Sequence, residues 1–359
     1  MRSKKTAGPA AKTGLCLAVL LAAGLLCALP AAAAPAARTF TDSAGREVSL
    51  PAKIERIAPS GALAQTVLYS LVPDRIIGWS AKLPGTVKRF MPEKYWNLPI
   101  FGTFYGKNAN LNLEALIAAR PDVVIDIGEA KKNEKEDMDR LQKQLGIPVV
   151  FVEATMFSFS KAYRTLGGLL GAETEAARLA AFCDAAIKDG QSLAAAVPAE
   201  KRAKIYYGEG STGLQTNPRG SIHADVIDLI GAVNAADIPV TSGAGGNQIS
   251  MEQLILWNPD LIIFGPAGAY AKVPSDPLWK NLSAVKAGRI YEIPEGPFNW
   301  MGRPPATNRL IGIYWLGSIA YPEYAKWDLK AKAREFYRLF YHYDLSDAEF
   351  AELTKNSVH

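Results

Sequence analysis

A proline-rich segment near the end of the chain, PFNWMGRPP at residues 297–305, holds the residue types best suited to bind a small molecule. Trp300 stands three residues before Arg303, and we expect Phe298 and Met301 beside them to be exposed apolar side chains. An aromatic wall next to a fixed guanidinium suits a planar or anionic molecule. In the structural alternative, Trp300 closes the core and Arg303 pairs with a surface acid. The sequence leaves both interpretations open.

Further candidates stand where the expected strands end, because loops at the carboxyl ends of parallel strands line the binding sites of α/β folds. The tyrosines among them could stack on a ligand or bind ferric iron as phenolates, although tyrosines beside strands are often packing residues. The predicted ligand-binding set is Trp79, Lys82, Tyr105, Lys107, Tyr207, Gln215, His223, Trp300 and Arg303. The loops from which it is drawn also contain Ser60, Glu129, Lys131 and residues 155–157, 207–211 and 215–217.

Histidine is too scarce to suggest a metal site built by the protein itself. The chain has 3 histidines: His342 in an aromatic helix, His359 at the terminus and His223 at an expected helix start. A bare Zn²⁺ or Mn²⁺ site needs several histidines or carboxylates that converge. Only His223 could reach a ligand, and a lone histidine is more often a satisfied polar residue. We therefore expect no cofactor and no directly bound metal, and a ligand that is a metal chelate or an organic molecule.

The glycine motif at residues 208–213, GEGSTG, follows an expected strand and matches G-x-G-x-x-G. A dinucleotide site would need a helix that opens within the motif, so that its N-terminus meets the pyrophosphate. Residues 214–220 contain Asn217-Pro218 and predict a further loop instead. The sequence has no nucleophile elbow, HExxH or paired catalytic motif. We therefore expect a binding protein and not an enzyme.

One segment occurs twice in the chain, as NLEALIAARPDVVI at residues 112–125 and SMEQLILWNPDLII at residues 250–263. Asn112 and Ser250 are typical N-cap residues, a glutamate follows in the first turn, and a proline ends each helix. The apolar run after the proline is typical of a parallel strand covered on both faces. A unit of helix and strand repeated this far apart indicates two similar lobes.

The remaining elements extend this alternation of strands and helices. Residues 40–50 predict a β-hairpin, and strands are expected at 54–58, 75–79, 149–152, 204–207 and 289–293. Residues 158–197 lack proline and predict one long helix or two nearly continuous helices. We expect an α/β protein with two parallel-sheet lobes joined by a single long helix and the ligand cleft between the lobes. The predicted divisions are 37–157 for the first lobe, 158–198 for the linking helix, 199–325 for the second lobe and 326–359 for C-terminal helices.

Residues 1–36 have the composition of a targeting segment. Basic residues precede the apolar run 14–29, which leads into an alanine-rich tract with an A-x-A-like cleavage zone. We expect a signal peptide that is cleaved on export to the periplasm, with lipoprotein anchoring at Cys27 as the lesser alternative. Its removal takes away four basic residues and no acid, so the formal charge falls from +5 to +1 and does not indicate nucleic-acid binding. Cys183 is then the only cysteine, and we expect its thiol to be packed in the core.

Together these features resemble the periplasmic substrate-binding proteins that serve ABC importers of iron-siderophore, haem and cobalamin type. The resemblance covers nearly the whole chain after residue 36, and it rests on the runs DSAGREVSLP, IERIAPS, NLEALIAARPDVVI, GIPVVFVE and SMEQLILWNPDLIIFGP. It implies two lobes on a rigid helix, with the ligand between them and little closure on binding. It also implies that Glu114 and Glu252 dock on arginines of the permease. The alternative is that each glutamate only complements a helix dipole.

The function expected from this resemblance is delivery of a metal chelate to an ABC transporter permease. The expected ligand is an iron-siderophore or a related complex such as haem or a corrinoid, with ferric iron as the metal. The alternatives are an oxyanion such as molybdate or tungstate, a metal ion, or, in another class, a periplasmic enzyme or metal-insertion accessory. An oxyanion would favour Ser, Thr, backbone N–H groups and Arg over an aromatic wall. We expect the protein to act in the periplasm as a monomer.

Overall fold

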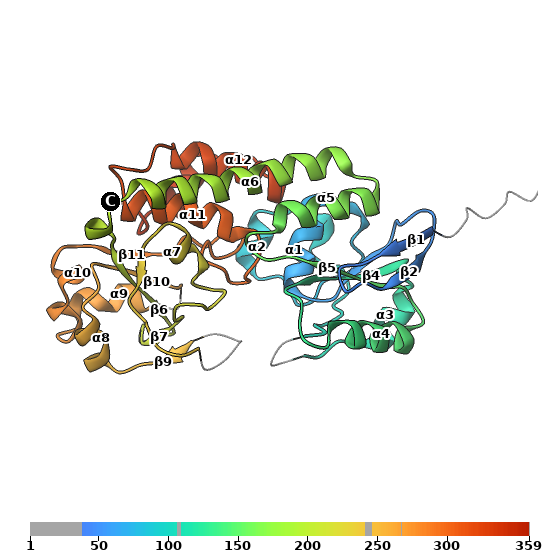
Figure 1. Ribbon diagram of the computed structural model, residues 1–359, viewed down its shortest axis with the longest axis horizontal. Helices are drawn as coiled ribbons and strands as arrows, with labels where there is room; N and C mark the ends of the chain where they lie inside the picture. The colour runs from blue at the N-terminus through green and yellow to red at the C-terminus, as the bar shows by residue number, and fades with distance from the viewer. Residues whose placement is uncertain (1–37, 106–108, 241–245, 267, 359) are drawn as a thin grey trace, which may run out of the picture. The chain divides into compact units, whose positions relative to one another are not determined.

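The computed structural model describes residues 38–105, 109–240, 246–266 and 268–358 (Figure 1). The predicted signal peptide at residues 1–36 and the predicted ligand residue Lys107 lie outside these ranges. Within them the strands form a two-stranded, a three-stranded and a six-stranded sheet, and no helix is long and apolar enough to cross a membrane.

The first lobe is built on short strands close to the N-terminal end of the described chain. β1 (Arg38–Thr41) and β2 (Glu47–Leu50) form the predicted antiparallel hairpin. β3 (Ile57–Pro59), β4 (Val123–Gly128) and β5 (Val149–Glu153) form a parallel sheet in the order β3-β4-β5. The carboxyl ends of these three strands therefore lie at one edge of the sheet.

Helices cover both faces of this sheet, which explains why β4 is apolar along most of its length. Val123 and Ile125 pack into the core that contains α1 (Ala62–Leu71). Val124 points the other way, into the cluster formed with α3 (Leu113–Ala119) and α4 (Glu134–Leu145). The alternation follows from the two-residue period of a strand. One further short helix, α2, spans Gly85–Arg89.

The strand predicted at residues 75–79 is wrong. Pro73–Arg75 forms a short 3-10 helix, for which proline at the first position fixes φ. Ile76 and Trp79 then form only isolated bridges, to Ile57 and Ile100. The other short 3-10 helices are Glu93–Tyr95, Ala199–Lys201, Val273–Ser275 and Trp279–Asn281.

The second lobe is built around β6 (Lys204–Glu209) and β10 (Leu261–Phe264), which are parallel. The sheet order is β11-β10-β6-β7-β9, and β8 also pairs with β6. β11 and β8 are parallel to their neighbours, whereas β7 pairs antiparallel with β6 and β9. The remaining elements of this lobe are β7 (Gln215–Thr216), α7 (Asp225–Leu229), β8 (Val233–Asn234), β9 (Asn247–Gln248), α8 (Met251–Trp257), α9 (Ala269–Lys272), α10 (Ser283–Lys286) and β11 (Ile290–Glu292).

The glycine motif at residues 208–213 forms the turn of a hairpin, and the loop predicted at residues 214–220 contains the short strand β7. Gly210 and Gly213 have φ angles of +73° and +74°, which only glycine adopts readily, and they reverse the chain between β6 and β7. A Cβ at Gly208 would lie 2.7 Å from the carbonyl oxygen of Gly213, so the two arms approach closely. No helix opens within this described segment.

The helices of the two repeated segments begin and end alike. Asn112 accepts a hydrogen bond from the amide of Ala115, and Ser250 accepts one from the amide of Gln253, so both are N-caps as predicted. Each helix ends at a residue in the left-handed region directly before the proline. These residues are Arg120 and Asn258, with φ angles of 48° and 41°.

The aspartate after each proline fixes the start of the neighbouring strand. Asp122 accepts hydrogen bonds from the amides of Glu55 and Arg56, just before β3, at 2.7 and 2.8 Å. Asp260 accepts one from the amide of Lys204, the first residue of β6, at 2.8 Å. The Pro-Asp pair thus ends a helix and positions the adjacent parallel strand in both lobes.

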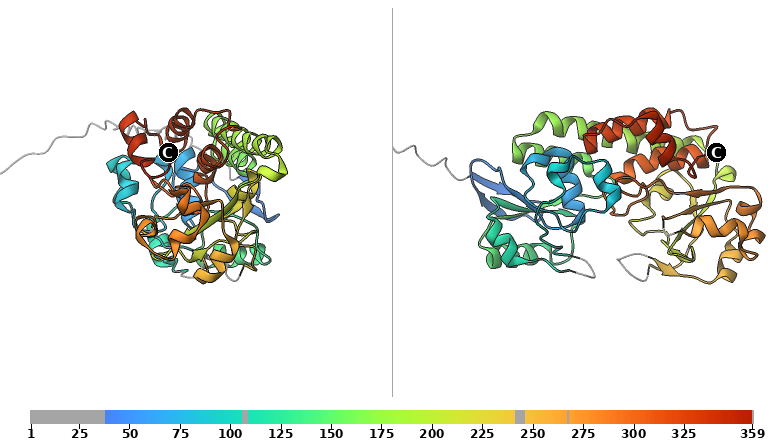
Figure 2. Two further views of the ribbon diagram at one scale, coloured as in Figure 1. Left: turned by 90° about the vertical axis from the view of Figure 1, so that its left-hand side faces the viewer. Right: turned by 180° about the vertical axis from the view of Figure 1, so that it is seen from behind.

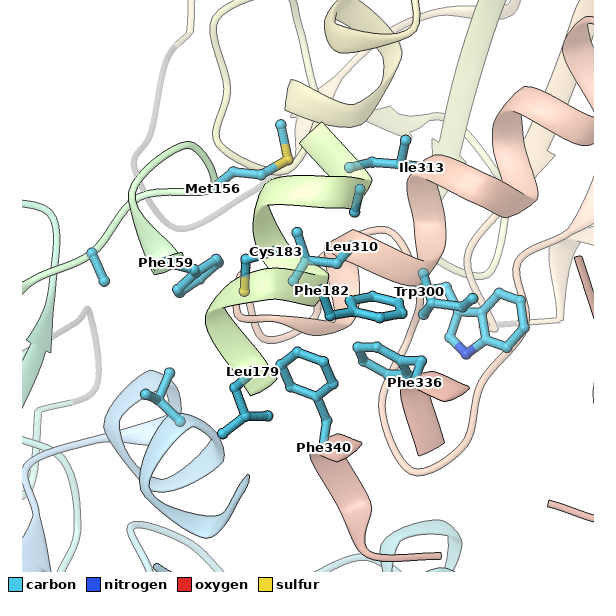
Figure 3. Packing of buried hydrophobic residues seen from close by; sticks show 14 of the residues in the cluster. Met156, Phe159, Leu179, Phe182, Cys183, Trp300, Leu310, Ile313, Phe336 and Phe340 are labelled. Carbon is cyan, nitrogen blue, oxygen red and sulfur yellow. The ribbon is translucent and has the colours of Figure 1, made fainter. Parts of the chain in front are cut away.

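The long helix α6 (Glu173–Ala196) connects the two lobes in the chain and packs against α11 (Asn308–Ala320) and α12 (Leu329–Tyr341) (Figures 1 and 2). Phe182 on α6 is central to this contact, because its ring lies 5.5–6.0 Å from the rings of Tyr314, Phe336 and Phe340. Figure 3 shows Phe182, Phe336 and Phe340 with Cys183, which is a buried free thiol as predicted. The last helix, α13, spans Asp347–Leu353.

The helix that precedes α6 folds back instead of continuing into it. α5 (Phe159–Leu170) ends at Gly171, whose φ of 62° reverses the chain, and the two helices then lie side by side (Figures 1 and 2). Gly167 permits their close approach, since a Cβ there would lie 2.5 Å from the Cβ of Ala176. The prediction of one long helix over 158–197 is therefore wrong. The alternative of two helices with only a short break between them is found, with the break at Gly171, but the helices fold back on each other and α6 alone is long.

Adjacent glycines in α5 provide a test of this packing. Gly167→Ala should destabilise the protein by about 1–3 kcal/mol, because the added methyl group has no room against Ala176. The control, Gly168→Ala, meets no atom within 4 Å and should stabilise the protein by about 0.5–1 kcal/mol through helix propensity. Urea unfolding of both variants measures these changes. Equal effects of the two substitutions would contradict the close contact between α5 and α6.

Candidate functional site

A buried carboxylate lies at the carboxyl end of the first parallel sheet. Asp126 on β4 accepts a hydrogen bond at Oδ1 from the hydroxyl of Ser60, which follows β3. Its other oxygen, Oδ2, is buried and has no hydrogen-bond partner among the described residues. Burial raises the pKa of Asp126 to about 6, against the hydrogen bond from Ser60 and the charge of Lys131. The carboxylate is therefore held at this edge at a cost to stability.

Tyr105 lies at the same edge of the first lobe, in a loop that reaches Ser60. The amide of the preceding Phe104 donates to the carbonyl of Ser60 at 2.8 Å. The hydroxyl of Tyr105 donates to Glu134 and Asp137 at 3.0 and 3.1 Å. Burial and these two carboxylates raise the pKa of Tyr105, so they favour the neutral phenol as a hydrogen-bond donor.

An ion pair occupies the carboxyl end of β6 in the second lobe. Arg303 donates from Nε to Oε1 of Glu209 at 2.8 Å and from Nη2 to Oε2 at 2.5 Å. Tyr207 and Asn217 donate to the same carboxylate at 3.0 and 2.8 Å. Burial opposes ionisation of Glu209, but these donors outweigh it and lower its pKa. The side chain of Arg303 is still 34% exposed, against 12% for Glu209, so the guanidinium can meet a solute.

His223 lies beside this ion pair as a neutral imidazole. Burial and the charge of Arg303 lower its pKa to about 4. Its Nδ1 lies 2.7 Å from the carbonyl oxygen of Gly302, so Nδ1 carries the hydrogen and donates it. The bare Nε2 then faces Nη1 of Arg303 at 3.5 Å. His223 thus orients the loop that carries Arg303 and, by its position, adds no positive charge.

The carboxyl ends of the two sheets come near each other around Arg309. This residue lies in the first turn of α11 and pairs with Asp225 at 2.7 Å. Its guanidinium carbon lies 5.9 Å from the ring centroid of Phe159, which follows β5. The pKa of Asp225 is raised by burial and, among its neighbours, by Glu129, which follows β4. Loops of the first lobe therefore act electrostatically on residues of the second.

The expected aromatic wall of exposed residues is wrong in this structure. Trp300 and Met301 are fully buried, and Trp79 is buried with its Nε1 donating to the carbonyl of Tyr95 at 2.7 Å. Trp300 is buried because α11 lies against its backbone. A Cβ at Gly312 would come 2.1 Å from the carbonyl oxygen of Trp300. In the segment 297–305, Phe298 and Arg303 are partly exposed, whereas Trp300 and Met301 are buried.

The other predicted ligand residues are spread over the two lobes. Lys82 is exposed, and so is Gln215 on β7 next to the Glu209 hairpin. Tyr207 is buried beneath Glu209, and its role here is the hydrogen bond to that carboxylate. Within the described residues, no group of three or more His, Cys, Asp or Glu side chains could hold a metal ion.

Three residues outside the predicted ligand-binding set belong to these edges, and two of them, Phe157 and Glu209, lie in loops that the sequence had named as candidates. Phe157, in the loop after β5, is 59% exposed and is an apolar ring open to solvent at the carboxyl end of the first sheet. Asp126 and Glu209 are the buried acids described above. The sequence held a signal for Asp126, because it is the single charged residue within the apolar strand VVIDIG.

Comparisons with known proteins show similarity along most of the chain. The model of a family described as periplasmic binding protein matches residues 89–297. The molybdate-binding protein MolA of Haemophilus influenzae is 26% identical over 351 residues, 90% of this chain and 95% of MolA. The Fe(3+)-citrate-binding protein YfmC of Bacillus subtilis is 26% identical over 209 residues, 57% of this chain and 64% of YfmC. An ABC transporter solute binding protein from Sulfurospirillum deleyianum is 30% identical with a TM-score of 0.82, covering 89% of this chain and 99% of its own.

The raised pKa of Asp126 leads to a testable pH dependence. Its pKa is about 6 in the folded chain against an ordinary value of 3.8, so between these values the folded state binds more protons than the unfolded state. The free energy of unfolding therefore falls as pH rises through this window. Asp126→Asn cannot ionise and should be about 1–2 kcal/mol more stable than the wild type at pH 7.5.

A matched control for this substitution is Asp139→Asn. Its carboxylate has a lowered pKa because of Lys135 and Arg46, so its loss should decrease stability at the same pH. Urea unfolding between pH 4 and pH 7.5 measures both variants. An Asp126→Asn protein whose stability falls with pH as steeply as the wild type would contradict the burial of an ionised Asp126.

Proposed function

Because the chain belongs to the periplasmic binding protein family, whose relatives are the substrate-binding components of ABC transporters, we propose that it is the receptor for an anionic metal chelate. Ferric iron is the metal that we propose, bound by its chelator as cargo. The receptor would present this chelate to the permease of an ABC importer. The observation that carries the choice of a chelate is the exposed ring of Phe157 at the carboxyl end of β5.

An exposed ring at this edge suits the organic shell of a chelate. Phe157 is 59% exposed, and Phe104 and Tyr105 are half-buried in an edge-to-face pair with centroids 4.6 Å apart. Contact with an organic ligand would remove this apolar surface from water, which favours binding. A bare oxyanion has no apolar surface to offer in return. The aromatic contact that we propose thus comes from Phe157 and the Tyr105 loop, in place of the buried Trp300.

Arg303 would supply the charge contact. A guanidinium suits carboxylate, catecholate and hydroxamate oxygens, because its planar fork binds two oxygen atoms at once. Glu209 holds this fork in the structure, so an anionic ligand group would bind beside Glu209 or displace it. The iron would then interact with the chelator, and the protein residues with the outside of the complex.

A second candidate is an oxyanion such as molybdate, which one specific observation favours. The molybdate-binding protein of Haemophilus influenzae is similar along 90% of this chain, whereas the Fe(3+)-citrate-binding protein of Bacillus subtilis covers 57% of it. Arg303, Ser60 and Asn217 could donate hydrogen bonds to such an anion. This ligand would not use Phe157, and that difference separates the two candidates.

Export to the periplasm is part of the proposal. A receptor for an importer must meet its ligand outside the cytoplasmic membrane, and residues 1–36 have the composition of a signal peptide. We also propose that Glu114 and Glu252 contact the permease. Both are exposed, and each lies in the first turn of its helix, where the helix dipole favours the ionised form.

Ligand titrations of matched variants test the chelate. Tryptophan fluorescence of the purified protein would follow titration with ferric citrate, ferric siderophores, haem, cobalamin and molybdate. The proposal expects micromolar or tighter binding of an iron chelate, about tenfold weaker in Phe157→Ala, which corresponds to about 1.4 kcal/mol. Arg303→Lys should also weaken binding, because it keeps the charge and loses the fork.

The control variant for surface truncation is Leu278→Ala, since Leu278 is an exposed apolar residue in the second lobe. It should bind every ligand as the wild type does. Molybdate binding that Phe157→Ala leaves unchanged, without binding of any chelate, would establish the oxyanion and refute the chelate. Turnover of any of these ligands by the purified protein would refute the receptor function.

A further inference from the structure

The repeated segments 112–125 and 250–263 carry the same residue at six matched positions, and the structure accounts for four of them. The leucine packs into the core of its lobe, the proline ends the helix, and the aspartate fixes the start of the neighbouring strand. The final isoleucine is buried in β4 or β10. The two remaining shared positions are the glutamate, which complements the helix dipole, and the isoleucine three residues after it.

These two positions are exposed in both copies. Ile117 on α3 is 46% exposed and Ile255 on α8 is 43% exposed. Each lies three residues after its glutamate, Glu114 or Glu252, so the carboxylate and the apolar side chain share one face of a helix. Among the described residues, neither isoleucine belongs to the hydrophobic core of its lobe. The same carboxylate–isoleucine pair is thus presented to solvent twice.

Chance is a poor explanation for two exposed isoleucines at equivalent positions of the repeated segments. Scattered exposed apolar residues are normal, and the described residues include seven large ones: Ile100, Ile117, Phe157, Val240, Ile255, Leu256 and Leu278. Two of them occupy equivalent positions in two helices that are 138 residues apart in the sequence. Leu256, which is 78% exposed, enlarges the patch in the second lobe only, where the first lobe has Ala118.

The negative charge of each carboxylate–isoleucine pair indicates what kind of partner it could bind. Among the described residues neither Glu114 nor Glu252 takes part in a salt bridge, and the pKa of Glu252 is lowered by its own backbone amide and by Ser250. Both side chains are exposed, so a cation outside the chain can reach either carboxylate. A partner that fits has a guanidinium or ammonium group beside an apolar pocket, and it has this arrangement twice.

We propose that Ile117 and Ile255 are the apolar half of a two-point contact with the permease, each inserting beside the cation that its neighbouring glutamate binds. This inference rests on the proposed function, because it takes the permease of the importer as the partner. The glutamates attract and orient the permease, whereas the isoleucines lose their exposed surface and slow dissociation. Because Leu256 enlarges the apolar surface, the contact of the second lobe is the stronger of the two.

Binding to the permease complex of the protein's own importer, held in lipid nanodiscs, tests this inference. Ile117→Ser and Ile255→Ser should each weaken binding about five- to tenfold, the second more than the first, with a faster dissociation rate and an almost unchanged association rate. Ile255→Val should retain most of the affinity. Glu114→Gln with Glu252→Gln should instead slow association, and this effect should decrease at high salt.

Leu278→Ser is the matched control, because Leu278 is exposed outside the repeat and should bind the permease as the wild type does. Urea unfolding of each variant shows whether the fold is kept. Wild-type binding that survives both isoleucine substitutions would overturn the inference and leave the proposed function intact. A wild-type protein that does not bind the permease at all would refute the proposed function itself.

Discussion

A guanidinium that has lost most of its water needs a counter-charge, and the carboxyl edge of the second sheet is arranged around that requirement. Arg303 has its counter-charge in Glu209, which Tyr207 and Asn217 hold in place, while His223 remains neutral beside it. An anionic ligand must offer Arg303 a partner at least as good as Glu209 or share the guanidinium with it. The affinity then depends on how much more favourable the free energy of the Arg303–ligand pair is than that of the Arg303–Glu209 pair. This favours ligands whose oxygen atoms match the planar fork over ligands that carry charge alone.

At its carboxyl edge the first sheet carries acidic groups in place of a paired arginine. Among the described residues, Oδ2 of the buried Asp126 has no hydrogen-bond partner and no arginine pairs with this carboxylate, while Tyr105 donates to two further acids. Phe157 adds an exposed ring to this edge. An acidic, apolar edge near an edge that holds a paired arginine suits a ligand of mixed character, with an organic shell and both donor and acceptor groups. A bare oxyanion would use only one of the two edges, and this asymmetry is the physical reason for preferring a chelate.

The sequence predicted the scaffold well, because its signals are local. Asn112 and Ser250 are caps, Pro121 and Pro259 end helices, and the apolar runs after them are buried strands in both lobes. It failed where long-range packing decides. Gly171 turns α5 back onto α6, and Gly312 lets α11 lie on the backbone of Trp300, so the expected aromatic wall is buried. Arg303 was identified from its loop, but its pairing with Glu209, 94 residues earlier, depends on the tertiary fold.

Native mass spectrometry of the protein exported and purified from its own host tests the central claim most directly, since it identifies what the receptor carries without a choice of ligand in advance. The account predicts an added mass that equals a ferric chelate, present in the wild type and greatly reduced in Phe157→Ala and Arg303→Lys. An added mass of molybdate or another bare oxyanion, retained in Phe157→Ala, would contradict the account.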